Sequence, residues 1–468
     1  MENAYLHVIF IGRKKSESET CNAFIYNLEI ESGMLEESIS TITFQRINNV
    51  LNKIQTDVLI HIKDVENNIM HNINTAIAVI SQTKGFARIA VPLEDSKHLN
   101  WITDLSIETL KQWNTPKIRI QVITQDRPNS LSRLVRSLNS AFYLGDDVPM
   151  TMNIDRSADP VTLKYCKTFK WKYGKKEIRH RVVQGGLLPA IIESYYPVDE
   201  DDYGIILEDD IEVSPFFYIW TKYSILKYRY GPKRVLSGRM FGVSFYNTKI
   251  NELDMNGRRP FDPRLALKGT DYPSQTPYLS QVPCSWGAVF FPEIWREFHY
   301  YLTARLIDNE GPKLQNITVP NCRANKWRKS WKRFFIELVY LRGYVMLYPN
   351  YDNFTSLSTN HAERGTHIHN PNSPIVFGLP LMSENNVITG LPESRLPEFE
   401  NLPIMDLLGN VVSSEEIIQR GRSFHSKVSE CPPNDSNEIK YDPEDLLCVN
   451  EEMKQNATKS ESTQNVNV

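Results

Sequence analysis

Three consecutive carboxylates, Glu208, Asp209 and Asp210, are the residues of this chain whose types and spacing best suit chemistry. Adjacent carboxylates repel one another, which favours either a bound cation or a raised carboxyl pKa. Hard oxygen ligands suit Mg²⁺ or Mn²⁺, and proteins typically hold Mg²⁺ through one or two carboxylates together with substrate phosphates. The alternative is a solvated acidic turn, which is the usual explanation for a run of acids.

The sequence on either side of the three acids favours chemistry over a solvated turn. Residues 205–207 are a short apolar run of the kind found in buried strands. Ser214 and Pro215 then predict a helix start, because Ser is a preferred N-cap and Pro fits the first helical position. This helix is expected to run from Phe216 to about Tyr230. The acids should therefore lie at the carboxyl end of a buried strand, where open α/β sheets bind their ligands.

The order of elements around the acids predicts an α/β fold. Between residues 116 and 230 the strand and helix patterns alternate four times, which is typical of a parallel sheet covered by helices. The strand-like runs lie at 118–124, 150–154, 179–183 and 205–207. We expect this region to be the centre of the molecule.

The rest of the chain divides into segments by composition and pattern. Residues 1–115 read as a smaller N-terminal α/β unit, whose strand-like runs lie at 6–11, 41–44, 58–62 and 87–91. This unit has no glycine-rich phosphate loop, so a supporting or partner-binding role is expected. The central domain is expected at 116–370, a C-terminal extension at 371–425, and a disordered tail rich in Ser, Asn, Glu and Lys at 426–468.

Composition restricts the possible partners. The 468 residues are 41% hydrophobic and carry a formal net charge of −3, so the chain as a whole does not attract nucleic acid or anionic membranes. No stretch approaches the roughly 18–20 apolar residues that span a bilayer. The apolar run at 6–11 is too short for a signal peptide. The six cysteines lack paired metal-type spacing, which excludes a zinc ribbon.

Three runs of the sequence together resemble a GT-A glycosyltransferase. They read IQVITQDR at 120–127, MNID at 152–155 and ILEDDIEVSPFF at 206–217. The third run most specifically resembles the eukaryotic N-acetylglucosaminyltransferase I and protein O-mannose N-acetylglucosaminyltransferase group. In that group, Glu-Asp-Asp is followed by a hydrophobic residue, an acid, an apolar residue, a small residue, Pro and aromatics. The similarity covers roughly residues 116–369.

The resemblance implies a fold, a reaction and its partners. The fold would be GT-A, the Rossmann-like fold of nucleotide-diphospho-sugar transferases. The enzyme would move a hexosyl or N-acetylhexosaminyl group, with inversion, from a nucleotide-sugar donor to a hydroxyl of a glycan, glycoprotein or glycolipid acceptor. The cofactor would be Mn²⁺ or Mg²⁺. The compartment would be the Golgi or ER lumen if the resemblance holds, and the cytoplasm if the absent signal and anchor are real.

The resemblance also implies roles for particular residues. Asp210 would be the direct metal ligand, while Glu208 and Asp209 would contact the sugar or ribose, or reach the metal through water. The residues that would hold the nucleotide are Thr124, Asp126, Arg127 and Asp155, with Gln184 and Gly185 lining the same crevice. A late histidine often completes the metal shell in such enzymes, and the candidates here are His361 and His367.

Each of these roles has a simpler alternative. Asp126 precedes Pro128 closely and could form a turn. Gly185 and Gly186 could be part of an ordinary loop. The two histidines could be loop residues without a ligand.

The catalytic base is where this chain departs from the resembled group. That group carries a Trp-Asp-Asp-Trp-like stretch, whereas residues 330–337 here read SWKRFFIE. Glu337 is the one carboxylate in this stretch, so it is the candidate base. It could equally be a structural ion-pair partner of Arg333 or Arg342.

Two other functions stay open at this point. A nucleotidyltransferase would share the nucleotide-binding sheet and the metal carboxylates, but a glycine-rich basic loop near its amino terminus is expected and is absent here. A non-catalytic sugar-binding or scaffold protein could keep the fold without the base. The missing Asp-Asp pair allows this second alternative, and the intact Glu208-Asp209-Asp210 argues against it.

Overall fold

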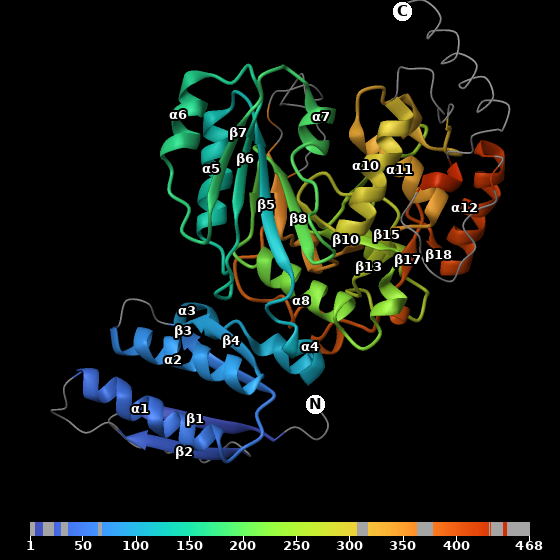
Figure 1. The fold of residues 1–468 in the computed structure, drawn as a ribbon. Coiled ribbons are helices and arrows are strands. Elements are labelled where there is room, and N and C mark those ends of the chain that lie inside the picture. The colour runs from blue at the N-terminus through green and yellow to red at the C-terminus, as the bar shows by residue number, and fades with distance from the viewer. Residues whose placement is uncertain are drawn as a thin grey trace, which may run out of the picture.

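The protein is organised around a ten-stranded mixed sheet (Figure 1). The computed structural model describes residues 5–12, 23–29, 36–63, 68–306, 317–361, 363, 378–429, 431 and 443–446. Across the sheet the strand order is β18-β17-β13-β15-β10-β14-β8-β5-β6-β7. The strands are β5 (Lys117–Thr124), β6 (Met150–Ile154), β7 (Lys176–His180), β8 (Asp202–Glu208), β10 (Met240–Ser244), β13 (Tyr278–Ser280), β14 (Ala288–Phe290), β15 (Val345–Tyr348), β17 (Ile404–Met405) and β18 (Val411–Val412).

The order of the central strands reverses at β5, which is a topological switch point of the sheet. From β5 the chain continues outward through β6 and β7, then returns to add β8 on the opposite side of β5, and all four strands are parallel. Such a reversal opens a crevice at the carboxyl ends of the strands. The neighbouring β14 runs antiparallel to both β8 and β10, so its amino end lies at the same edge of the sheet.

Helices cover both faces of the sheet, and the side chains of β8 show how. Successive residues of a strand point to opposite faces. Ile205 and Leu207 pack in one core with α5 (Pro128–Asn139) and α8 (Phe217–Arg229), while Ile206 packs in another with α7 (Leu187–Ile192), α10 (Pro292–Leu306) and α11 (Trp331–Arg342). Residues 205–207 are thus buried on both faces of the sheet, which explains their continuous apolar run. The predicted α/β class is confirmed.

Further short elements complete the central region. They are α6 (Pro160–Thr168), η2 (Arg234–Ser237), β11 (Ile250–Asn251), β12 (Arg259–Pro260), α9 (Pro263–Ala266), η3 (Arg323–Lys326), η4 (Asp352–Phe354), η5 (Pro392–Ser394) and η6 (Phe399–Asn401). The last described piece of chain is η7 (Pro443–Leu446).

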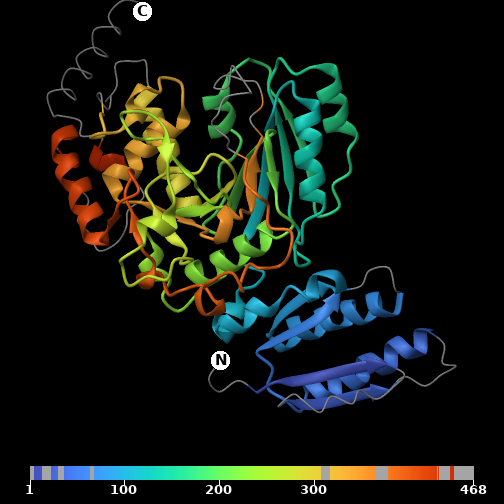
Figure 2. The ribbon, with the colours of Figure 1, turned by 180° about the vertical axis from the view of Figure 1, so that it is seen from behind.

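The N-terminal unit lies beside the amino ends of the central strands (Figures 1 and 2). It contains two separate parallel pairs, β1 (His7–Gly12) with β2 (Phe24–Glu29) and β3 (Val58–Lys63) with β4 (Ala87–Pro92). Helices α1 (Glu36–Leu51) and α2 (Asn68–Lys84) supply a small core of their own. The strand expected at 41–44 is wrong, because these residues lie within α1. Two later residues of the same helix, Ile47 and Leu51, pack in that core.

The end of the N-terminal unit is built into the main core. After β4 come α3 (Leu93–Ser96), η1 (Asn100–Asp104) and α4 (Ile107–Lys111). Trp101 and Trp113 stack at 5.4 Å, and Trp101 also contacts Tyr223 of α8 at 5.2 Å between ring centroids. Both tryptophans are fully buried within the core that holds β5 and α8.

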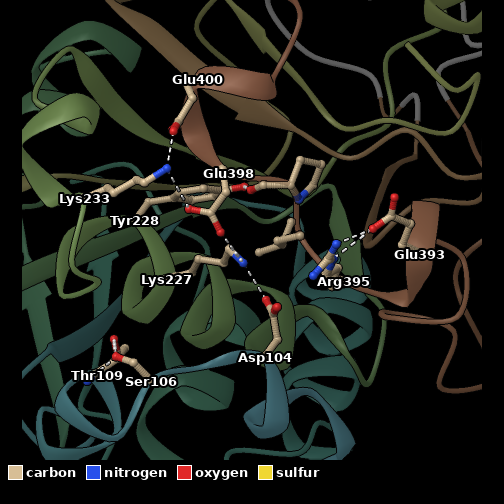
Figure 3. A network of polar contacts seen from close by, with 12 residues as sticks. Asp104, Ser106, Thr109, Lys227, Tyr228, Lys233, Glu393, Arg395, Glu398 and Glu400 are labelled. Atoms are coloured by element: carbon tan, nitrogen blue, oxygen red, sulfur yellow. Dashed lines mark hydrogen bonds and ion pairs between the residues drawn. The ribbon is translucent and has the colours of Figure 1, made fainter. Parts of the chain in front are cut away.

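Ion pairs fasten the same region to the C-terminal part of the chain (Figure 3). Asp104 of η1 accepts from Lys227 of α8 at 2.7 Å, and Lys227 also lies 3.4 Å from Glu398. Tyr228 donates to the carbonyl of Pro397 at 2.8 Å. Three segments that are distant in sequence are therefore joined around α8.

Residues 378–429 belong to the same body as the central strands. Strand β17 pairs with β13, β18 pairs with β17, and α12 (Ser414–Val428) packs on α11. One more strand, β16 (Ser358–Asn360), pairs antiparallel with β9 (Ile211–Val213), directly after the three acids. Within the described part of the chain, no helix is long and apolar enough to cross a membrane.

The helix that follows the acids begins slightly later than expected. Helix α8 runs from Phe217 to Arg229, with Phe216 at its N-cap. Ser214 accepts from the Phe216 backbone N–H at 3.2 Å and donates to the carbonyl of Met382 at 2.6 Å. Its hydroxyl therefore links the start of the helix to the C-terminal segment.

Candidate active site

The three acids lie at the carboxyl end of β8, at the point where the sheet changes direction. Strand β8 ends at Glu208, and Ile123 of β5 is its register partner. The Asp209 backbone N–H then donates to the carbonyl of Ile123 at 3.1 Å. The side chain of Asp209 is 1% exposed and that of Asp210 is 16% exposed. A solvated acidic turn is incompatible with this burial.

Arg127 and Thr124, from the end of β5, hold the middle acid. Thr124 Oγ1 donates to Asp209 Oδ2 at 2.8 Å, and the Arg127 guanidinium forms a close ion pair with Asp209 Oδ1. Arg127 also reaches Asp210, with 3.5 Å between Nη1 and Oδ2. The structure thus brings Thr124 and Arg127, two of the predicted donor-binding residues, into contact with the acids. Both oxygens of Asp209 are occupied by the protein, whereas Asp210 is held more loosely.

Burial and crowding raise the pKa of all three carboxyl groups. Desolvation, followed by the charges of Asp210 and Asp209, raises the pKa of Glu208 to about 8. Desolvation raises the pKa of Asp209 to about 6, although Arg127 and the Thr124 hydrogen bond oppose it. Desolvation also raises the pKa of Asp210. The acids therefore crowd more negative charge into the crevice than Arg127 offsets.

A strand from much later in the sequence closes the site on one side. Asn360 of β16 is the register partner of Ile211, and its side chain hydrogen-bonds Asp210. The backbone N–H of His361 donates to the carbonyl of Asp210 at 2.9 Å. His361 Nε2 lies 2.6 Å from Glu212 Oε2. The structure thus brings His361 next to the acidic motif and turns one ring nitrogen toward Glu212.

The beginning of β14 lies next to β16 at this edge of the sheet. Gly287 has a φ of +98°, and a Cβ there would lie 3.2 Å from Ser358 and 3.3 Å from Leu207. A side chain would therefore push β14 away from β8 and β16. Ser358 Oγ donates to the backbone carbonyl of Trp286 at 2.6 Å, which joins β16 to the chain just before β14.

A pocket adjoins the acids at the carboxyl ends of β5, β6 and β7. It has a volume of about 210 Å³, and its polar lining includes Thr124, Asn153, Asp155, Arg179 and Arg181. The Asp155 backbone N–H donates to the carbonyl of Thr124 at 3.1 Å, which places Asp155 beside the end of β5. Asp155 Oδ1 accepts from the Ser157 N–H at 3.3 Å. Asp155, a predicted donor-binding residue, therefore lies directly after β6 at the edge of this pocket.

The other residues predicted to bind the donor lie in loops. Asp126 is exposed. Gln184 is exposed in the loop after β7, and Gly185 lies against the Arg181 guanidinium. The helix after this loop, α7, has only six residues, so its amino terminus provides no strong anion site. His367 lies outside the described residues.

Glu337, the candidate base, is placed in an ion-pair cluster. Its side chain is 1% exposed. Arg305 lies 2.9 Å from Oε2 and 3.2 Å from Oε1, Arg333 lies 3.2 Å from Oε1, and Tyr301 donates to Oε2 at 2.8 Å. Both oxygens are thus occupied by buried donors. This geometry favours the alternative that Glu337 is a structural ion-pair partner of Arg333, with Arg305 as a second partner; Arg342 pairs with Glu297 instead.

The residues present fit a hard divalent cation. Among the described residues, no three His, Cys, Asp or Glu side chains converge as a complete ligand set. Mg²⁺ typically needs one or two carboxylates, with substrate phosphates and water completing its shell. Asp210 provides a carboxylate with excess negative charge around it, and His361 lies on the adjoining strand.

Sequence patterns did not identify several residues of this site. Arg179 lies in β7 and Arg181 directly follows this strand, while Glu212 and Asn360 belong to the paired strands β9 and β16. The pattern of β7 gave one available signal, since arginines at a strand end that borders a predicted crevice suit phosphate groups. The pairing of β16 with β9 has no local signal, because it joins segments that are distant in sequence.

Part of the chain matches a family model. The model is described as the SPBC1E8.03c C-terminal domain and matches residues 129–248 and 258–311, less than half of the chain. These residues include the acidic motif but not Thr124 or Arg127. A comparison with curated proteins finds no similar sequence.

Two solved structures resemble part of the chain. The crystal structure of S. aureus TarS 1–349 has a TM-score of 0.27 and 11% sequence identity, covering 50% of this chain and 58% of that one. The crystal structure of GalNAc-T7 with UDP, GalNAc and Mn²⁺ has a TM-score of 0.30 and 14% identity, covering 50% of this chain and 42% of that one. This chain therefore spans less than two thirds of the length of either structure.

Proposed function

We propose that the central region is a metal-dependent glycosyltransferase that moves a sugar from a nucleotide-sugar donor to a hydroxyl acceptor. The observation that carries the proposal is the position of Glu208, Asp209 and Asp210. They are desolvated, have raised carboxyl pKa values, and lie at the switch point of the sheet, beside a pocket lined by Arg179 and Arg181. A cation suits the three carboxyl groups, and a phosphate-bearing ligand suits the arginines of the adjoining pocket.

The side chains suggest how the donor would be held. Asp155 and Thr124 border the pocket, where they offer hydrogen-bonding groups to a nucleoside. Arg179 and Arg181 would contact phosphate oxygens, Arg181 from a position where its guanidinium also pairs with Glu193 at 2.7 Å. The bound cation, held by Asp210 with His361 as the second candidate ligand, would offset the charge that develops on the leaving diphosphate. Arg127, fixed by Asp209, would add to that positive charge.

A second function is favoured by the placement of Glu337. With both oxygens of Glu337 held by buried donors, a nucleotide-sugar-binding protein without transfer activity fits the same crevice. The resemblance to the N-acetylglucosaminyltransferase I group, the inverting stereochemistry and the donor sugar belong to the first proposal and are predictions within it.

One experiment separates the two functions. The intact protein is incubated with a panel of nucleotide sugars and Mn²⁺, and the release of nucleoside diphosphate is measured with and without hydroxyl acceptors. A glycosyltransferase releases diphosphate with Mn²⁺ and loses this activity in excess chelator. Metal-dependent binding of nucleoside diphosphate without release, for every donor and acceptor, supports the second function. The absence of metal-dependent binding contradicts both.

A further inference from the structure

A second cavity lies at the opposite end of the central strands from the acidic motif. It has a volume of about 950 Å³ and separates the N-terminal unit from the amino ends of β5 and β6. Thr124 borders the active-site pocket and Lys117 borders this cavity, so the length of β5, roughly 23 Å at 3.3 Å per residue, separates them. Ligand sites are typically 300–1,000 Å³ and are common at domain interfaces.

The lining of this cavity contains more basic than acidic residues. Two acidic residues line it, Asp146 and Asp147. Six basic residues also line it: Lys63, Arg88, Lys111, Lys117, Arg119 and Lys222. Four of the six have carboxylate partners, in the pairs Lys222–Asp146 at 2.6 Å, Arg119–Asp202 at 2.8 Å, Lys111–Asp57 at 2.9 Å, and Lys117–Asp199.

The other two cations, Arg88 and Lys63, come from the same face of the β3–β4 pair. In the register, Arg88 lies opposite Leu59 and Lys63 lies opposite Pro92, so both side chains share a face with Ala90 between them. Neither has a carboxylate partner among the described residues. Arg88 Nε donates to His61 Nε2 at 2.8 Å, and Lys63 Nζ donates to the carbonyl of Gly145 at 3.2 Å. Burial lowers the pKa of the Arg88 guanidinium, as expected for a desolvated cation without an acid.

The walls of the cavity are fixed without a ligand. Gly145 has a φ of +83°, and a Cβ there would lie 2.3 Å from the carbonyl oxygen of Ala90, so the loop packs directly on β4. The Leu144 backbone N–H donates to Asp95 at 2.7 Å. The ion pair of Asp104 with Lys227 also joins the end of the N-terminal unit to α8 (Figure 3). A pre-formed cavity binds without the entropic cost of ordering its walls.

We propose that this cleft is a second ligand site, which binds a small phosphate-bearing molecule through Arg88 and Lys63. The proposal goes beyond the glycosyltransferase function and does not depend on it. The two cations stand about four residues apart along neighbouring strands, roughly 13 Å, so a ligand with several charged groups suits them better than a single phosphate. Gln82 of α2 is exposed at the rim and offers a position where charge can be changed without disturbing the core.

The probe for this site is sodium tripolyphosphate, titrated calorimetrically into the intact protein in excess chelator. We expect binding that weakens at least tenfold in the double variant Arg88→Gln, Lys63→Gln. We also expect Gln82→Lys to strengthen binding several-fold and Gln82→Glu to weaken it by a similar factor, because charge at the rim acts without contact. Lys53→Gln, on an exposed position of the same unit, is the matched control and should bind like the wild type.

The location of the site is decided by one more variant. Arg127→Gln removes the cation of the acidic motif and should leave tripolyphosphate binding unchanged. The proposal is overturned if Arg127→Gln loses binding while the double variant keeps it, if Lys53→Gln weakens binding equally, or if the wild type shows no binding at 10 mM probe, roughly the level that excludes even a weak site. If the double variant does not fold, the opposite effects of Gln82→Lys and Gln82→Glu decide the question.

Discussion

Arg127 faces three carboxyl groups, and this imbalance of charge is the property of the site most open to experiment. Asp210 has one oxygen 3.5 Å from Arg127, whereas both oxygens of Asp209 are engaged. A cation that enters the site therefore competes least with the protein at Asp210. We therefore expect Asp210 to bind the cation and Asp209 to hold Arg127.

Asp210→Ala should remove metal-dependent nucleotide binding and leave the fold intact. Calorimetric titration of a nucleoside diphosphate with Mn²⁺ measures the first effect, and we expect affinity to fall at least 100-fold because a direct ligand is lost. Thermal unfolding in chelator measures the second. Glu177→Gln, on the outer strand β7, is the control and should change neither. Unaltered Mn²⁺-dependent binding in Asp210→Ala would falsify the metal assignment.

Glu208→Gln should stabilise the metal-free protein at alkaline pH. The folded pKa of Glu208 is about 8, above its ordinary value of 4.5, so the unfolded state loses its proton first as the pH rises. The wild type therefore loses stability between about pH 4.5 and 8, and Gln removes that loss. We expect a difference of roughly 1–2 kcal/mol above pH 8, which allows for partial solvent screening, and none near pH 4.

Urea unfolding across this pH range, in chelator, measures the difference between Glu208→Gln and the wild type. Saturating Mn²⁺ should reduce it, because a bound cation removes the repulsion in the wild type. A difference that does not vary with pH would show that Glu208 is not the group whose ionisation destabilises the fold.

Glu337→Gln should destabilise the fold rather than abolish nucleotide binding. It leaves the buried Arg305 and the partly exposed Arg333 without their charge partner, and removing one partner of a buried ion pair typically costs about 3–5 kcal/mol. Urea unfolding measures this loss, and nucleotide titration at low temperature should be unchanged. The control is Glu416→Gln, which removes an exposed ion pair with Arg420 and should cost about 0.5 kcal/mol or less. Normal stability with turnover lowered about 100-fold would instead make Glu337 the base.

At the scale of elements, the sequence predicted best what is local. The apolar run at 205–207 predicted β8, and the acids that follow this run lie at the carboxyl end of the strand. Ile118 to Thr124 gave β5 in the same way. The helical spacing within α1 was missed at 41–44, because Thr and Ile also favour strands and the helix is decided by the core it covers.

What the sequence could not give are contacts between distant segments. Nothing near Glu337 shows that Arg305, on a separate helix, will reach it. Nothing near Asp210 shows that Asn360 will arrive from β16. These contacts depend on how helices and strands pack, which local propensity and periodicity do not encode.

The N-terminal elements fall into two groups with different expected effects on the central sheet. Trp101 lies in the main core with β5 and α8, whereas Ile47 lies in the small core of α1 and α2. Trp101→Ala should cost about 3–5 kcal/mol and loosen β5 and α8. Ile47→Ala should loosen α1 and α2 and leave β5 protected.

Hydrogen exchange, resolved by segment, distinguishes these outcomes. If Trp101→Ala leaves β5 and α8 as protected as in the wild type, the α3–α4 segment is independent of the main core. In that case, a chain that begins near Asn114 should stay soluble and bind donor. If β5 loses protection, such a shortened chain should aggregate, because the surface that Trp101 and Trp113 cover would be exposed.

At the scale of the whole molecule, the central sheet and its crevice draw on most of the chain. The first strand of the sheet begins at Lys117, and the last, β18, ends at Val412. The Asp104–Lys227–Glu398 connection joins three parts of the chain at one place. The molecule therefore behaves as one cooperative body over this range, with the α1–α2 core beside it.

The pairing of β9 with β16 sets a time at which the acidic motif can become complete during synthesis. Glu212 and His361, which meet across that pair, are 149 residues apart. A ribosome that adds 5–20 residues per second needs about 7–30 s to produce the second partner after the first. Through that interval the nascent chain carries three acids at a strand end without Asn360 beside them. Messages that terminate before codon 360 should therefore yield chains that expose this edge and are handled by chaperones or proteases.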